Sequence, residues 1–187
     1  AGYATTTGHN NTAIGYQSLY TNTTGDTNVA VGKDSMKANT TGTNNTAVGP
    51  RSLQSNTTAA NNVAVGDLAL GSNTTGSLNA ALGVNALQNN TTASENTAVG
   101  YRAGFSNTTG AENTAIGLRS LQTNTTGSKN TAVGRGALLF NTTADNNTAV
   151  GYQSAYSNTT GGQITSVGFQ ALSANTTAFN NNAFGLW

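Results

Sequence analysis

The sequence predicts an all-β fold, a β-solenoid (β-roll) of eleven 17-residue turns. Three observations predict it: a repeat of fixed length, a short β-prone triplet in each unit, and turn-forming Gly and Asn at fixed places. The consensus unit is N-T-A-V-G-x-x-S/A-L-x-x-N-T-T-G/A-x-x, without insertion or deletion, and its first Asn is replaced only at Ile164. Helical-hairpin repeats need roughly 33 residues or more. A unit of 17 residues therefore fits one solenoid turn.

The repeat predicts one domain over 1–187. A half-turn covers 1–10, the full units begin at Asn11, and a terminal half-turn covers 181–187. Positions in a unit are counted below from the Asn of N-T-A-V-G, and residues that share a position form a column along the stack.

Each unit is read as four elements in order. A first short strand covers T-A-V, where β-branched residues favour extended backbone. The glycine at position five makes a corner, a second strand lies around S/A-x-L, and N-T-T-G makes the second corner, since Gly and Asn tolerate positive φ. Successive turns stack about 4.8 Å apart, so identical Asn side chains can hydrogen-bond along the stack.

The columns predict which side chains point inward. Position four is always apolar, as at Val99, so we expect it to fill the coil. Its neighbours, such as Ala98 and Gly100, then face outward, because adjacent strand residues point to opposite faces. Residues that small on an outer face predict side-by-side packing of coils, where another backbone comes close. The alternative is that Ala and Gly simply suit a tight strand and corner.

The charged residues predict the solvent-facing columns. All thirteen lie at positions six, seven, ten, sixteen and seventeen, for example Lys33, Asp34, Lys37, Glu95 and Asp145. An unpaired charge is costly to bury, so these five columns should face water.

The segment from Asn147 to Ala155 (N-T-A-V-G-Y-Q-S-A) resembles the head repeats of trimeric autotransporter adhesins and related repeats of phage tail fibres and bacterial surface fibres. The resemblance covers nearly the whole chain. It implies a left-handed β-roll, usually a trimer, with an adhesive or fibrous role outside the cell, on a cell surface or on a phage particle. The N-T-T-G corner makes this unit longer than the common adhesin repeat.

Composition excludes several classes of function. Charged residues make up 7% of the chain and the net charge is +1, whereas nucleic-acid and anionic-membrane binding need clustered Lys and Arg. No apolar run approaches the roughly 20 residues of a membrane span. There is no cysteine, the only histidine is His9, and no carboxylate pair recurs. We therefore expect no enzyme, no cofactor and no metal.

The N-T-T triplets are also N-x-T glycosylation sequons. A turn ladder of Asn and Thr explains every copy without a glycan, and this interpretation is favoured. The candidate Asn residues are Asn22, Asn39, Asn56, Asn73, Asn90, Asn107, Asn124, Asn141, Asn158 and Asn175. Thr arrays also raise ice binding as a minor alternative, although N-T-T lies beside a corner.

Aromatic residues at positions six and ten are candidate partner contacts, since Tyr is favoured in recognition surfaces. They are Tyr16, Tyr20, Tyr101, Phe105, Tyr152 and Tyr156. The alternative is that a ring at position ten leans over a gap where position nine has lost its Leu, as at Gly104 and Ala155.

The end segments complement each other, because N-N-A-F-G-L-W followed by A-G-Y-A-T-T-T-G-H-N makes one full unit. The hypothesis is head-to-tail stacking into a self-assembling extracellular fibre, and a fragment of a longer array is the competing explanation. The expected junction residues are Ala1, Gly2, Tyr3, Thr6, Thr7, Gly8, Phe184, Gly185, Leu186 and Trp187. The expected partners are copies of the chain and a host surface or glycan. The alternative function is that of a receptor-binding trimeric adhesin head or a phage tail-fibre segment.

Overall fold

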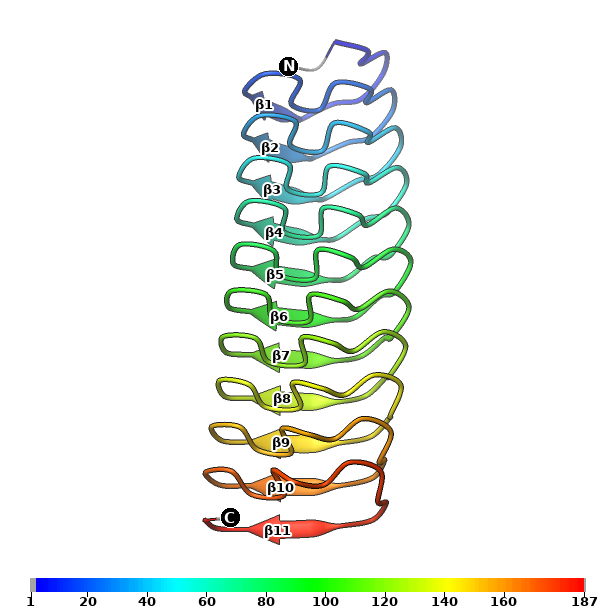
Figure 1. Cartoon of the computed structure of the whole chain (residues 1–187). Coiled ribbons are helices and arrows are strands. Elements are labelled where there is room, and N and C mark those ends of the chain that lie inside the picture. Colours follow the sequence, from blue (N-terminus) through cyan, green and yellow to red (C-terminus); the bar gives the residue numbers. More distant parts are fainter. Residues whose placement is uncertain (1–2, 187) are drawn as a thin grey trace.

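A computed structural model describes residues 3–186 and confirms the β-solenoid. The coils stack into a rod with the two termini at opposite ends (Figure 1). Eleven parallel strands, one from each turn, form a single sheet in chain order. The strands are β1 (Thr12–Ile14), β2 (Val29–Val31), β3 (Thr46–Val48), β4 (Val63–Val65), β5 (Ala80–Leu82), β6 (Thr97–Val99), β7 (Thr114–Ile116), β8 (Thr131–Val133), β9 (Thr148–Val150), β10 (Thr165–Val167) and β11 (Asn182–Phe184).

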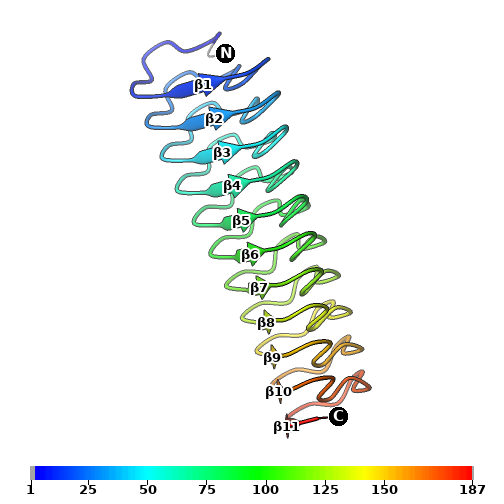
Figure 2. The same ribbon diagram turned by 90° about the vertical axis from the view of Figure 1, so that its left-hand side faces the viewer.

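The register of the sheet follows the repeat length. Ala98 of β6 pairs with Ala115 of β7, and the same 17-residue step relates every pair of neighbouring strands. The arrows turn from side-on at β1 to nearly end-on at β11, so the sheet twists along the rod (Figure 2). Residues at one position therefore form continuous ladders from one end to the other.

The second strand predicted around S/A-x-L is wrong. This segment is a chain of turns in which positions seven and nine take positive φ, such as 51° at Gln17 and 50° at Leu19. Left-handed backbone interrupts an extended strand. The segment still bonds between turns, because the Leu19 amide donates to the Ser35 carbonyl at 3.0 Å.

The predicted direction of the strand side chains is also wrong. Ala98 at position three is 0% exposed, whereas Val99 at position four is 37% exposed. The core is thin: Ala at position three and Leu at position nine form one buried cluster along the rod. The strand side opposite the Leu column therefore holds only small side chains, Ala throughout the buried cluster and the buried Ser166.

Glycine is required at position five for a different reason from the one predicted. Gly100 takes φ +130°, and a Cβ placed there would lie 2.7 Å from the carbonyl oxygen of Gly117 in the next turn. A close backbone does require the glycine, but that backbone belongs to the next turn of the same chain. The prediction that a neighbouring coil packs against Ala98 and Gly100 is therefore not supported by their small size.

Two buried Asn ladders hold the second corner. The Nδ2 of Asn107 donates to Asn90 Oδ1 at 2.9 Å and to the Gly110 carbonyl at 2.8 Å. Asn at position one uses the same type of acceptor, since Asn113 Nδ2 donates to the Gly127 carbonyl at 2.9 Å. The backbone N–H of Asn113 donates to Asn96 Oδ1. Buried amides are costly unless bonded, and here each turn satisfies the next.

Candidate functional site: an uncharged sheet face

The outer surface of the sheet is a continuous face made by positions two and four, called here the aliphatic face. Both positions point away from the Ala at position three, because strand side chains alternate. Position four contributes Ile14, Val31, Val48, Val65, Leu82, Val99, Ile116, Val133, Val150, Val167 and Phe184. Position two contributes Thr12, Val29, Thr46, Val63, Ala80, Thr97, Thr114, Thr131, Thr148, Thr165 and Asn182.

The aliphatic face is partly exposed and carries no charge. Position four is 37% exposed at Val48, Val65 and Val99, and more so at Leu82. None of its 22 side chains is Asp, Glu, Lys or Arg. Long contiguous apolar surfaces are uncommon on monomers and usually mark interaction sites. The face therefore has the character of an association surface.

The sequence contains a signal that indicates this face. Position four ranges from Val to Phe184, whereas position three is Ala in every full unit except for Ser166. A close-packed interior resists changes of volume. The variable column was therefore the outward one, and the invariant small column was the core.

The charged columns are placed as predicted. None of the thirteen charged residues is buried. The two ion pairs found within residues 3–186 are Lys37 with Asp34, at 3.7 Å, and Arg51 with Asp67, at 3.0 Å. The Arg51–Asp67 pair is exposed and therefore stabilises the fold only weakly.

The six predicted contact aromatics are all at least partly exposed, with Tyr16 at 68% the most exposed. The structure does not gather them into one site. Tyr152 stacks on Phe169, Tyr156 meets Phe140 edge-on, and Tyr20 stacks on Tyr3. Sequence reasoning missed Phe140 and Phe169, which occupy the neighbouring turns.

Leu87 of the preceding turn lies close to the space that a side chain at Gly104 would fill. A Cβ at Gly104 would lie 2.9 Å from Leu87 Cδ2. The guanidinium of Arg102 lies over the Phe105 ring, 4.9 Å from its centroid.

The sequon asparagines form the ladder interpreted from the sequence. Nine are buried, and Asn175 is partly buried. The Nδ2 atoms that would carry a glycan donate to the neighbouring Asn, as in Asn124 to Asn107 at 2.8 Å. The second Thr of each triplet, such as Thr109, is exposed in a single file along the corner. This file is one residue wide, unlike the broad Thr plane that an ice-binding surface requires.

The end residues expected at a subunit junction are described in part. Ala1, Gly2 and Trp187 lie outside the described residues. Tyr3, Phe184 and Leu186 are highly exposed, and Thr6 already bonds within the chain, its amide donating to the Thr23 carbonyl at 3.0 Å. Thr7 and Gly8 also donate to Thr23, while Gly185 donates to Val167.

The described residues offer few groups for acid–base or metal chemistry. His9 is exposed near the first turn. Within 3–186 no group of three His, Cys, Asp or Glu side chains is placed to hold a metal ion. The same residues contain no helix long and apolar enough to cross a bilayer.

Comparison with known proteins adds no relative. No family model matches the chain, and neither a curated protein nor a solved structure matches it.

Proposed function

We propose that this chain is a structural rod of an extracellular fibre, built by association of β-solenoid coils. The observation that carries the proposal is the aliphatic face, which runs uncharged along all eleven strands. Burying such a face removes roughly 25 cal/mol of unfavourable hydration for each Å² of apolar surface. Its geometry repeats from turn to turn and therefore suits another copy of the same face, so the partner is a second or third copy of the chain.

End-on stacking is the second part of the proposal. Every turn both donates to and accepts from its neighbours: the Thr114 amide donates to the Asn130 carbonyl, and the Gly134 amide donates to the Ile116 carbonyl. A turn of another copy offers the same groups in the same order. Unpaired strand edges bind further strands readily, so the ladder can continue across a boundary between subunits.

Sedimentation analysis tests the side-by-side association. Val99→Lys combined with Val133→Lys places two charges on the aliphatic face, and we expect the mass in solution to fall while β-sheet circular dichroism persists. The matched control, Thr109→Lys combined with Thr143→Lys, adds the same charge to the opposite corner and should keep the assembled mass. An unchanged mass in the Val double variant would reject the aliphatic face as the interface.

Electron microscopy of a variant without residues 1–10 tests the end-on stacking. The half-turn caps the second half of the first unit, for instance through the Thr6 amide on the Thr23 carbonyl. Its removal should shorten or abolish filaments and leave the other turns folded. Filaments of normal length would reject a junction in which the end segments of two copies complete one turn. They would favour the explanation that the chain is a fragment of a longer array.

The second candidate is a trimeric adhesin head or tail-fibre segment with a discrete receptor site. It is favoured by the departures from the repeat in turns six to ten, where arginine and aromatic side chains gather at positions six, seven and ten. Discrete rods of one length and a fixed trimeric mass would support this candidate. Filaments of unlimited length would support the fibre.

A further inference from the structure

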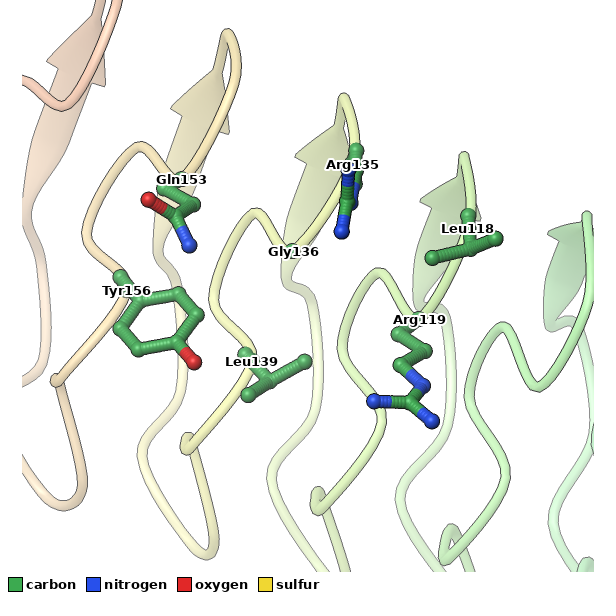
Figure 3. Close-up of a pocket in the computed structure, with 7 residues that line it drawn as sticks. All are labelled: Leu118, Arg119, Arg135, Gly136, Leu139, Gln153 and Tyr156. Atoms are coloured by element: carbon green, nitrogen blue, oxygen red, sulfur yellow. The ribbon is translucent and has the colours of Figure 1, made fainter.

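A notch interrupts the corner next to the sheet in the eighth turn (Figure 3). Position seven carries a side chain in every other full turn, but here it is Gly136. The missing side chain opens a space between Arg119 of the preceding turn and Gln153 of the next. Arg135 and Tyr156 also line it, and this space is called here the Gly136 notch.

The backbone at Gly136 is the ordinary backbone of its column. Gly136 has φ +66°, and Arg119 and Gln153 hold the same left-handed conformation at φ 58° and 50°. A Cβ at Gly136 would meet Gln153 and Tyr156 at an ordinary 3.5 Å. Neither the fold nor the close packing of the turns therefore requires glycine there, in contrast to Gly100.

Unpaired positive charge surrounds the notch. Arg102, Arg119 and Arg135 occupy three successive turns at positions six and seven, and none of them forms a salt bridge within residues 3–186. The acidic residues of this half, Glu95, Glu112 and Asp145, lie at positions sixteen and seventeen. Those positions precede the strand, whereas the arginines follow it, although Lys129 also lies at position seventeen.

Aromatic rings accompany the arginines. The Arg102 guanidinium lies 4.9 Å from the Phe105 centroid, and that of Arg135 lies 5.7 Å from the Tyr152 centroid. Rings in such contacts hold a guanidinium in place while its N–H groups remain available as donors. In Figure 3 Gln153 and Tyr156 lie on one side of Gly136 and the two labelled arginines on the other, with Leu139 between Tyr156 and Arg119.

We propose that the Gly136 notch and its three arginines bind an acidic polysaccharide. A carboxylate or sulfate group enters the notch and accepts hydrogen bonds from Arg119 and Arg135, since a guanidinium fork can donate two parallel hydrogen bonds to two oxygens of one anionic group. Gln153 and the Tyr156 hydroxyl can both donate to and accept from sugar hydroxyls. Arg102 serves a further anionic group, because turns about 4.8 Å apart repeat on the scale of single sugar units. The binding does not depend on association through the aliphatic face.

Calorimetric titration of the full chain with polygalacturonate, dextran sulfate and neutral dextran tests the proposal. We expect the two anionic polymers to bind, with affinity falling as salt is raised, and neutral dextran not to bind. The anionic polymer that binds with the higher affinity identifies the carboxylate or the sulfate as the preferred group. Equal binding of neutral dextran, or no binding of either anionic polymer at low salt, would overturn the proposal.

The variant Gly136→Gln fills the notch with a side chain that position seven already carries at Gln153. It should fold normally and weaken polysaccharide binding about tenfold, the effect of one charged hydrogen bond. Arg119→Gln combined with Arg135→Gln should weaken binding at least as much, and Arg51→Gln, from the ion pair in the other half, less than about twofold. Unchanged binding by the notch-filled or double-arginine variant would overturn the site. If the double-arginine variant lost self-association but kept polysaccharide binding, the arginines would instead be contacts with the acidic residues of another copy.

Discussion

At the scale of single residues, each strand buries its small residue at position three and exposes its larger residue at position four. Ala98 is fully buried and Val99 lies outside, so the larger residue of each pair is the exposed one. The alternation of side chains was predictable from the sequence, but its predicted direction is wrong. The apolar residues at position four predict burial, whereas the structure places them on the outer face.

The first prediction contrasts these two neighbours. Ala98→Leu forces three extra carbons into the thin core and should lower the free energy of unfolding by about 1–3 kcal/mol or more. Val99→Lys should change it by less than about 1 kcal/mol, because the lysine stem follows the outer face. Urea unfolding at dilutions that keep both variants dissociated gives the comparison. Equal losses in the two variants would contradict the side-chain directions in the structure.

The second prediction concerns the buried amides. Asn107→Ala removes the two hydrogen bonds that Asn107 Nδ2 donates and the one that it accepts from Asn124 at 2.8 Å. Because buried groups lose their partners, we expect a loss of about 2–4 kcal/mol in denaturant unfolding. The control Thr109→Ala, on the exposed file of the same corner, should stay within about 0.5 kcal/mol. A small loss at Asn107 would mean that the ladder contributes little to stability.

At the scale of the elements, the sequence predicted the T-A-V strand, the glycine corner and the N-T-T-G corner. The segment between the corners could not be predicted, because ordinary residues such as Gln17 and Leu19 take positive φ there. Isolated left-handed residues other than glycine are disfavoured. Here hydrogen bonds to the adjacent turns compensate, as between the Asp34 amide and the Tyr16 carbonyl at 2.8 Å.

The third prediction separates two kinds of glycine. Gly100→Ala places a Cβ against the carbonyl of Gly117 and should cost at least about 3 kcal/mol, from strain and overlap combined. Gly136→Ala meets only ordinary contacts and should cost only the left-handed backbone strain of about 1–2 kcal/mol. Thermal melts of the two variants test this. Similar melting temperatures would show that the next turn moves to accept a side chain at Gly100.

At the scale of the whole molecule, the repeat length sets the register of every ladder. Each turn contacts only its neighbours along the rod, so stability should be close to a sum over turns and their interfaces. The solenoid was predictable for this reason, since fixed spacing alone dictates stacking. The aliphatic face was not predictable, because its position depends on which way one three-residue strand faces.

The fourth prediction uses deletions. Removing residues 79–95, one whole unit, should leave a folded rod with the same circular dichroism per residue and a smaller denaturant m-value, since less surface is exposed on unfolding. Removing residues 80–95 instead takes out 16 residues and shifts the following columns by one place. That variant should lose several kcal/mol, because Asn and Leu no longer meet their own ladders. Comparable stability of the two deletions would contradict a register set by the 17-residue period.

Thiol accessibility tests the covered aliphatic face most directly, because the chain has no cysteine of its own. Single substitutions Ala98→Cys, Val99→Cys and Thr109→Cys would be labelled with a maleimide in assembled and diluted samples. Ser166 shows that position three accepts an atom beyond Cβ. Cys at 98 should resist labelling at all concentrations, and Cys at 109 should react at all concentrations. Cys at 99 should be protected in the assembly and reactive after dilution. Reactivity at 99 equal to that at 109 in the assembled sample, or reactivity at 98 above that at 99, would contradict an outward aliphatic face that coils cover when they associate.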